Sequence, residues 1–307
     1  MTKTINTKDH TDIKRLVWIE KFIPTSTRPY AYLMRLDRPI GIWLLLLPGL
    51  WGISLASNGI LNLRPTEYYI PLLFVIGAII MRGAGCVVND LWDRDLDKMV
   101  ERTKNRPIAS GDITPIKGTI FMATLLLIGL AILIQLNTTT IILGIFSIPL
   151  IISYPLMKRI TWWPQAFLGL TFNFSALMGY CAITNEITIS AALLYLGGIF
   201  WTLGYDTIYA HQDKEDDLMA GIKSTALKFG KNSKLWISVF YTLSITSILC
   251  AQATEHGLSI KHAIAIIPIM HLTWQIYTWN TASQQSSLSI FKSNQVTGIL
   301  VLIILSV

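Results

Sequence analysis

The chain has 307 residues, of which 52% are hydrophobic and only 14% are charged, and its mean hydropathy is +0.51. A soluble domain carries about 25% charged residues, so this composition indicates a membrane protein. The net charge of +7 does not indicate a nucleic-acid partner, because the basic residues lie in short stretches between apolar segments. The three cysteines lie far apart in apolar runs and predict neither a zinc site nor a disulfide framework.

Residues 1–39 are polar and mixed in charge, and they are predicted to form a cytoplasmic N-terminal tail without the apolar core of a signal peptide. About 20 apolar residues cross a bilayer core, and nine later segments approach that length. Residues 40–307 are therefore predicted to form a single all-α transmembrane domain, a bundle of about nine helices. The nine segments span roughly 40–57, 68–88, 116–136, 139–155, 164–184, 188–210, 234–254, 262–280 and 294–307. The last contains only 14 residues, so whether it fully crosses the membrane stays open.

The distribution of basic residues predicts the orientation of these segments. Twenty of the 25 Lys and Arg residues lie in the N-terminal tail and the even-numbered connections, and only two lie in the odd-numbered connections. An excess of Lys and Arg marks the cytoplasmic side of a membrane protein. The N-terminus and both of the acidic clusters described next are therefore predicted to lie in the cytoplasm.

The first acidic cluster follows the second apolar segment and reads Asn-Asp-Leu-Trp-Asp-Arg-Asp-Leu-Asp over residues 89–97. If the apolar helix continues through it, Asn89, Asp93 and Asp97 are four residues apart and share one face. Arg82 lies seven residues before Asn89, inside the apolar run and near the same face. An arginine at this depth is energetically costly and is expected to face a polar cavity.

The second acidic cluster follows the sixth apolar segment, over residues 206–217. Asp213 and Asp217 lie seven and eleven residues after Asp206, which again predicts one helix face. Carboxylates this dense repel one another, by roughly 4 kcal/mol for a pair at about 4 Å in an intermediate dielectric. Because the two clusters are four segments apart, the bundle is predicted to contain two similar four-helix halves.

A hard divalent cation is the natural counter-charge for these carboxylates. Mg²⁺ takes oxygen ligands and usually binds through a few carboxylates together with substrate phosphates. We therefore expect Mg²⁺ and a diphosphate, and the apolar bundle beside them predicts a lipid tail, as in a polyprenyl diphosphate. Basic residues suited to phosphate oxygens follow or separate the clusters, namely Arg94, Arg102, Arg106, Lys158, Arg159 and Lys223.

Two simpler interpretations explain the clusters less well. A single acidic run is usually a solvated helix end, but two runs with helical spacing, each after an apolar helix and on one side of the membrane, are not readily explained this way. A calcium-binding EF-hand loop requires Gly at its sixth position and Glu at its twelfth. Counting from Asp93, these positions hold Lys98 and Lys104, so that interpretation fails.

Four motifs resemble a known family. The first is Asn89-Asp90-x-x-Asp93-x-x-x-Asp97, followed by Arg102-Thr103-x-x-Arg106-Pro107. The second is Asp206-Thr207-x-Tyr209-Ala210-x-x-Asp213-x-x-x-Asp217, followed by Gly221-Ile222-Lys223-Ser224-Thr225-Ala226. Segments 35–41 and 153–159 add Arg-Leu-Asp-Arg-Pro-Ile-Gly and Ser-Tyr-Pro-Leu-Met-Lys-Arg. Taken in their order along the chain, from about residue 30 to 230, they resemble the UbiA family of intramembrane aromatic prenyltransferases.

The resemblance implies a reaction, and the wording of the motifs is most similar to family members that act on 4-hydroxybenzoate. It implies Mg²⁺-dependent transfer of a polyprenyl chain from polyprenyl diphosphate to the ring carbon ortho to the hydroxyl of 4-hydroxybenzoate, in ubiquinone biosynthesis. The diphosphate ionises to leave an allylic carbocation, the aromatic carbon attacks it, and a proton is lost. The expected location is a bacterial inner membrane, multi-pass with a cytoplasmic active site, or the mitochondrial inner membrane in a eukaryote.

The resemblance also implies roles for individual residues. The expected metal ligands are Asn89, Asp93, Asp97, Asp213 and Asp217, and the four aspartates among them are the expected catalytic residues. The expected substrate-binding residues are Arg35, Arg82, Arg94, Arg102, Tyr154, Lys158, Arg159 and Lys223. Three of these arginines, Arg35, Arg82 and Arg159, are alternative partners for the acceptor carboxylate, and their spacing does not rank them.

Two rival functions stay open from the sequence. One is a sister prenyltransferase with another acceptor, of the menaquinone or haem-farnesylating type. The other is an ion-coupled secondary transporter, which is less favoured because transporter sites lie near the bilayer midplane and these clusters lie at one surface. The sequence does not reveal the prenyl chain length, the oligomeric state, the protein partners or the source organism.

Overall fold

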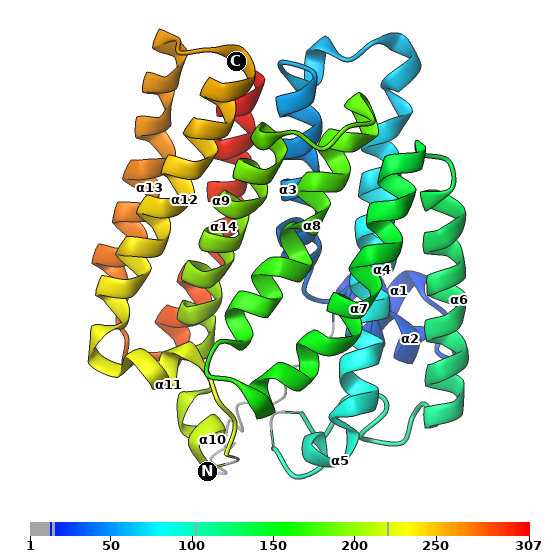
Figure 1. Cartoon of the computed structure of the whole chain (residues 1–307). Coiled ribbons are helices and arrows are strands. Elements are labelled where there is room, and N and C mark those ends of the chain that lie inside the picture. Colours follow the sequence, from blue (N-terminus) through cyan, green and yellow to red (C-terminus); the bar gives the residue numbers. More distant parts are fainter. Residues whose placement is uncertain (1–12, 14–15, 102, 220) are drawn as a thin grey trace. The chain divides into compact units, whose positions relative to one another are not determined.

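The computed structural model describes residue 13 and residues 16–101, 103–219 and 221–307, and within these residues every regular element is a helix (Figure 1). In this described part of the chain, nine helices have 13 or more residues: α3 (Ile40–Ala56), α4 (Tyr69–Trp92), α6 (Pro115–Leu133), α7 (Thr138–Ile160), α8 (Pro164–Thr184), α9 (Ile189–Ala210), α12 (Ser233–His256), α13 (Ile266–Thr278) and α14 (Gln284–Ser306). The shorter helices are α1 (Val17–Phe22), α2 (Arg28–Leu33), α5 (Arg94–Asp97), α10 (Lys214–Met219) and α11 (Thr225–Phe229). The predicted all-α fold class is therefore confirmed.

The long helices correspond to the nine predicted segments, with two clear differences in their ends. Helix α7 continues five residues beyond the predicted end at 155, so Lys158 and Arg159 belong to its last turn and not to a connection. Helix α14 begins at Gln284, ten residues before the predicted start. Its first turns are rich in Gln and Ser and escape a hydropathy criterion, but the Ser283 hydroxyl caps the helix by accepting from the amide of Ser286.

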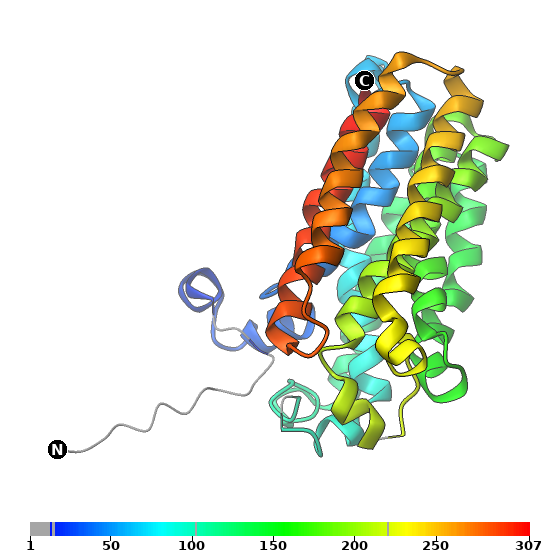
Figure 2. The ribbon, with the colours of Figure 1, turned by 90° about the vertical axis from the view of Figure 1, so that its left-hand side faces the viewer.

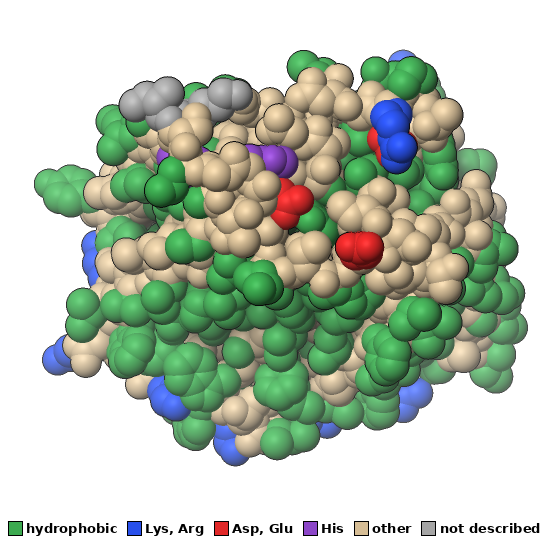
Figure 3. Space-filling model, turned by 45° about the horizontal axis from the view of Figure 1, so that its top comes forward, with side chains coloured by type: hydrophobic (Ala, Val, Ile, Leu, Met, Phe, Trp, Pro, Cys, Tyr) green, Lys and Arg blue, Asp and Glu red, His purple; other side chains and the backbone are tan. Residues whose placement is uncertain are grey.

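The chain is a multi-span membrane protein. In the described residues, six helical stretches are long and apolar enough to cross a membrane, and α14 is among them. Large apolar side chains are exposed on these helices, including Ile120, Leu127 and Phe146 at 62%, 66% and 68%. Apolar side chains likewise cover much of the lower part of the face drawn in Figure 3. Lipid tails tolerate such a surface, whereas water does not. That nine segments cross the membrane stays a prediction.

The chain divides into two compact units, Met1–Pro39 with Ile79–Leu130, and Ile40–Ala78 with Ala131–Val307. We call them the first and the second unit. One division falls at the predicted boundary between residues 39 and 40, but the first unit also takes up residues 79–130. The assignment of residues 40–307 to one domain, and the two similar four-helix halves, stay predictions.

The first unit has a small apolar core built around the C-terminal part of α4. Leu33 at the end of α2 packs with Ala84 and Val87 of α4, and all three are at most 1% exposed. The connection after α5 folds back into this core through Ile108 and Ile113. The segment before residue 40 is thereby fixed against the end of α4 that carries the first acidic cluster.

The second unit is held together by close helix pairs. Helix α3 packs on α8, α8 packs on α9, and α12 packs on α9. The α3–α8 pair has small residues at its contact: a Cβ added at Gly52 would lie 2.6 Å from the backbone nitrogen of Tyr180. Small residues let membrane helices approach closely and gain dispersion contacts.

Helix α14 closes the second unit by lying along α3 (Figure 2). The buried Trp51 indole donates to the carbonyl of Gly298 at 2.8 Å, and its ring lies 4.9 Å from that of Trp201 in α9. The Ser54 hydroxyl donates to the carbonyl of Leu305 at 3.0 Å. These contacts satisfy polar groups that lipid or a dry core would otherwise leave without a partner.

Candidate active site at two acidic clusters

The first acidic cluster begins in α4 and ends in α5, and the predicted continuous helix is interrupted inside it. Helix α4 stops at Trp92, and Asp93 has φ −94° and ψ 4° before α5 starts at Arg94. The backbone amide of Asp93 nevertheless donates to the backbone carbonyl of Asn89 at 2.9 Å, and the amide of Asp97 donates to the carbonyl of Asp93 at 2.8 Å. The four-residue spacing on which the prediction rested therefore persists locally, although the regular helix does not.

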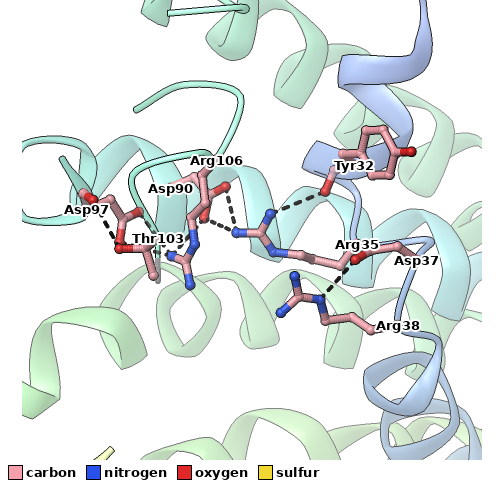
Figure 4. Close-up of polar contacts among 8 residues, drawn as sticks. All are labelled: Tyr32, Arg35, Asp37, Arg38, Asp90, Asp97, Thr103 and Arg106. Carbon is pink, nitrogen blue, oxygen red and sulfur yellow. Dashed lines mark hydrogen bonds and ion pairs between the residues drawn. The ribbon is translucent and has the colours of Figure 1, made fainter. Parts of the chain in front are cut away.

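Two arginines neutralise part of this cluster inside the first unit (Figure 4). Nη2 of Arg35 lies 2.8 Å from both carboxylate oxygens of Asp90, and this pair is buried, with side chains 7% and 1% exposed. Nη1 of Arg106 lies 3.3 Å from Oδ1 of Asp90 and 3.0 and 3.1 Å from the two oxygens of Asp97. The repulsion expected among these carboxylates is thus offset in part by the chain's own cations.

The charged form of Asp97 is disfavoured by its surroundings. Its burial raises its pKa above the ordinary value, the charges of Asp90 and Asp93 raise it further, and Arg106 opposes the increase. Asp93 and Asp97 are 4% and 7% exposed, so water screens them little. An added cation beside Asp97 would lower the free energy of its ionised form.

The remaining site residues predicted in the first unit lie in varied surroundings. Arg82 is partly buried within α4, as expected for an arginine inside an apolar run. Arg94 is partly buried, and its Nη2 lies 3.0 Å from Oδ2 of the neighbouring Asp95. Arg35 is held by Asp90 and also donates to the carbonyl of Tyr32 at 3.2 Å. Arg102 lies outside the described residues. The substrate-binding roles of these arginines stay predictions.

The second acidic cluster is interrupted more strongly than the first. Helix α9 ends at Ala210, and residues 211–213 form a turn before α10 starts at Lys214. The prediction that Asp206, Asp213 and Asp217 share one continuous helix face is therefore wrong. Asp206 belongs to α9, whereas Asp217 belongs to α10. The backbone amide of Asp217 donates to the backbone carbonyl of Asp213 at 2.8 Å.

His211 fixes the end of α9 beside this cluster. Its Nε2 lies 2.9 Å from the hydroxyl of Ser233 at the start of α12, and its ring meets that of Trp279 edge to face at 4.8 Å. Burial lowers the pKa of His211 to about 4, and the charge of Lys214 acts in the same direction. His211 is therefore a neutral residue that packs between α9, α12 and Trp279.

The Gly-Ile-Lys-Ser-Thr-Ala motif has a structural explanation in the second unit. The amide of Lys223 donates to the carbonyl of Lys158 at 2.8 Å, and its ammonium donates to that of Ile160 at 3.0 Å. A cation at the last carbonyls of α7 is favoured by the helix dipole. The Ser224 hydroxyl caps α11, and the Thr225 hydroxyl lies 2.7 Å from that of Thr207 in α9. The motif therefore ties α7, α9 and α11 together.

The other residues predicted to bind substrate in the second unit lie on the same helix end. Tyr154, Lys158 and Arg159 occupy the last two turns of α7, with Arg159 exposed and the other two partly buried. The amide of Lys223 thus connects this helix end to the segment that follows the second cluster. The roles of all four residues toward substrate stay predictions.

The metal ligands expected from the sequence are chemically suitable. Asp93 and Asp97 are buried carboxylates, and the charge of Asp93 is close enough to raise the pKa of Asp97. Carboxylate and amide oxygens are the ligands that Mg²⁺ prefers. Within the described ranges, no three His, Cys, Asp or Glu side chains converge in a geometry that could hold a metal ion. The ligand set of Asn89, Asp93, Asp97, Asp213 and Asp217 stays a prediction.

The sequence profile of the UbiA prenyltransferase family matches residues 45–296. This chain belongs to the UbiA prenyltransferase family. The family suggested by the four motifs is thereby confirmed, and so is the interpretation of the chain as an enzyme of prenyl transfer.

Relatives within the UbiA family cover nearly the whole chain. The mitochondrial 4-hydroxybenzoate polyprenyltransferase of Arabidopsis thaliana is 48% identical over 94% of this chain and 70% of its own length. The 4-hydroxybenzoate geranyltransferase 1 of Lithospermum erythrorhizon is 44% identical over 94% of this chain and 92% of its own length. A solved UbiA homologue from Archaeoglobus fulgidus, bound to GPP and Mg²⁺, has 17% sequence identity and a TM-score of 0.68, and covers 90% of this chain and 98% of that one. This last likeness shows the shared UbiA fold.

Sequence interpretation missed the special position of Asp90 within the first UbiA motif. Asp90 was part of the acidic cluster, but nothing in the helical spacing of Asn89, Asp93 and Asp97 gave it a separate role. Its partner Arg35 is 55 residues away in the sequence. The only available signal was that Arg35, Asp90 and Arg106 all occur in motifs that resemble those of the family.

Proposed function

We propose that the chain transfers a polyprenyl group from polyprenyl diphosphate to the ring carbon ortho to the hydroxyl of 4-hydroxybenzoate, in ubiquinone biosynthesis. The observation that carries this proposal is the 48% identity, over 94% of the chain, with a relative named for that activity. The same activity was expected from the motifs alone. Identity this high over nearly the full length favours a 4-hydroxybenzoate acceptor over the menaquinone-type or haem-farnesylating alternatives.

We propose further that each acidic cluster supplies oxygen ligands to Mg²⁺. The residues involved are Asn89, Asp93 and Asp97 in the first cluster, and Asp213 and Asp217 in the second. The ion named with the Archaeoglobus fulgidus homologue supports this choice of metal. When bound, Mg²⁺ offsets the negative charge that develops on the departing diphosphate.

The chain's own residues have three tasks in this reaction. Arginines beside the first cluster, among them Arg94 and Arg102, bind phosphate oxygens through their forked donors. An arginine among Arg35, Arg82 and Arg159 binds the acceptor carboxylate. Apolar helices exclude water from the allylic cation, which would otherwise be trapped as an alcohol.

The transferred prenyl group is either a geranyl group or a longer polyprenyl group. Relatives named for polyprenyl transfer and for geranyl transfer match this protein about equally well, at 48% and 44% identity. Incubating membranes that contain the protein with 4-hydroxybenzoate, Mg²⁺ and a mixture of diphosphates from geranyl to polyprenyl separates them. The mass of the product reports the preferred donor directly. Offering other aromatic acids in the same mixture tests the sister prenyltransferases.

The proposed function predicts that Asp93→Ala and Asp213→Ala each abolish turnover while the protein still inserts into the membrane. The matched control is Asp112→Ala, an exposed carboxylate in the connection after α5, which is expected to retain activity. Chelation of divalent cations should stop the wild-type reaction and added Mg²⁺ should restore it. Full activity in both aspartate variants would refute the assignment, and ion flux across liposomes without diphosphate release would favour a transporter.

We propose that the protein is a multi-pass protein of an inner membrane, with the acidic clusters on its Lys- and Arg-rich side. In a bacterium this is the cytoplasmic face, and the mitochondrial names of the relatives support a mitochondrial inner membrane if the source is eukaryotic. Alkaline phosphatase fused within residues 98–114 should be inactive in a bacterial host. An active fusion at that point would invert the orientation.

A further inference from the structure

Asp90 differs from its neighbours in the first acidic cluster. It directly follows Asn89, so its side chain is rotated by about 100° around α4 from the face that Asn89 begins. Both of its carboxylate oxygens lie 2.8 Å from one nitrogen of Arg35. A carboxylate occupied in this way, and only 1% exposed, is poorly placed to act as a further metal ligand.

We propose that Asp90 is a positioning residue that, together with Arg35, holds the guanidinium of Arg106 against Asp97 and so sets where Asp97 and the connection after α5 lie. The proposal deepens the function given above and rests on it, since Asp97 is one of the proposed metal ligands. It assigns the second residue of the Asn-Asp motif a task separate from metal binding.

Arg106 connects Asp90 with Asp97. Nη1 of Arg106 lies 3.3 Å from Oδ1 of Asp90 and 3.0 and 3.1 Å from the two oxygens of Asp97. Asp90 belongs to α4 and Asp97 to α5, whereas Arg106 belongs to the connection that follows. The guanidinium therefore ties that connection to the end of both helices at once.

The opposite side of Asp90 is fixed by Arg35, whose own geometry is tightly constrained. Arg35 has φ +58°, a left-handed conformation that a residue with a side chain adopts only when its surroundings hold it there. Its guanidinium donates to Asp90 and to the carbonyl of Tyr32. Leu33, two residues earlier, is completely buried in the core of the first unit. Asp90 is thus anchored, through the side chain of Arg35, to a segment that packs into the core of the first unit.

The connection carried by Arg106 has a second attachment to the same place. The hydroxyl of Thr103 donates to the carbonyl of Asp97 at 3.0 Å, and Thr103 is 3% exposed. Ile108 and Ile113 bury their side chains in the core of the first unit. Loss of Asp90 would leave these contacts intact but would remove the carboxylate that shares Arg106 with Asp97. Without that contact the guanidinium of Arg106 would be fixed less firmly, and so would the position of Asp97.

The test compares Asp90→Asn with Arg106→Gln and Arg106→Lys, and uses Asp112→Asn as the matched control on an exposed carboxylate of the same connection. For each variant, the rate of prenyl transfer is measured as a function of Mg²⁺ concentration. Asp90→Asn is expected to raise the Mg²⁺ concentration at half-maximal rate about tenfold, the lower end of what a hydrogen bond to a charged group contributes, while kcat at saturating Mg²⁺ falls much less.

The Arg106 variants show whether Asp90 acts through Arg106. Arg106→Lys keeps a positive charge that can replace Nη1 of Arg106 beside Asp90 and Asp97. It is therefore expected to shift the Mg²⁺ dependence less than Arg106→Gln does. In the Arg106→Gln background, Asp90→Asn should add little further shift. Two results would overturn the proposal. One is a full additional shift when Asp90→Asn is added to Arg106→Gln, and the other is a loss of kcat with an unchanged Mg²⁺ dependence in Asp90→Asn alone. Either result indicates a structural role without coupling to Asp97.

A second readout does not depend on prenyl transfer. Trypsin cleavage after the exposed Lys98 and Lys104 reports how firmly the connection is held, with and without Mg²⁺ and inorganic diphosphate. Asp90→Asn is expected to accelerate this cleavage, and Asp112→Asn is not. If the wild-type protein transfers no prenyl group, the proposed function fails while this arm still judges the positioning role. Equal cleavage of the wild type and Asp90→Asn would overturn that role.

Discussion

The close contact between α3 and α8 provides a sharp test of how the second unit is packed. The change is Gly52→Ala, which adds one methyl group at the helix contact. That Cβ would lie 2.6 Å from the amide nitrogen of Tyr180, and closer still to the carbonyl oxygen of Ala176. Ordinary contact begins at 3.4 Å, so the backbones must separate by at least 0.8 Å.

The size of the effect follows from the nature of the neighbours. Both atoms belong to helical backbone and cannot rotate away, so we expect the upper end of the penalty for overpacking, about 3 kcal/mol. For a unit of this size, such a loss lowers the thermal midpoint by roughly 6–12 °C. Gly179→Ala on the facing helix should behave similarly, because its Cβ would lie 2.9 Å from the carbonyl carbon of Gly49.

The assay is the fraction of protein that stays monodisperse by size-exclusion chromatography after heating in detergent. The matched control is Gly77→Ala in α4, whose Cβ would have one neighbour, a side-chain atom of Ile132 at 3.9 Å. Since Ala is about 1 kcal/mol better than Gly in a helix, this control should be neutral or slightly stabilising. Equal midpoints for Gly52→Ala and Gly77→Ala would show that α3 and α8 do not approach as described.

Two further predictions concern buried polar pairs, and both use the same thermal assay. Arg35→Ala should destabilise the protein by about 3 kcal/mol, the lower end for a broken buried ion pair because Arg106 stays near Asp90. Arg35→Gly should be about 1 kcal/mol less harmful, since glycine tolerates φ +58°; a lower midpoint for Gly than for Ala would contradict this conformation. Thr207→Val and Thr225→Val should each cost about 1–3 kcal/mol by leaving one buried hydroxyl without its partner. The double variant should cost less than the two single changes together, and simple additivity would rule out the bond.

Hydropathy predicted the helices well but misplaced several of their ends. A run of about 20 apolar residues has to be helical in lipid, so the long segments were readable without any tertiary information. The polar first turns of α14 were not readable in this way, because that part of the helix is identified by the cap at Ser283 and not by apolarity. The break at Asp93 was equally invisible, since residues 89–97 keep a helical spacing on both sides of it.

The candidate site was predicted in its composition and not in its arrangement. Spacing alone singled out Asp93 and Asp97, which are buried, and placed Arg82 correctly inside an apolar helix. It could not reveal that residues 211–213 interrupt the second cluster, because His211 stops α9 through contacts with Ser233 and Trp279. These partners come from later parts of the chain, and a local pattern carries no information about them.

The amino-acid sequence by itself determined that this is an all-α membrane protein of the UbiA family with two acidic clusters at helix ends. These properties follow from the number of consecutive apolar residues and from which residue types recur at fixed spacing, and both are local. Only the tertiary structure decided which charges meet. Asp90 finds Arg35 across 55 residues because the core around Leu33 and Val87 brings their segments together, and burial makes that contact strong.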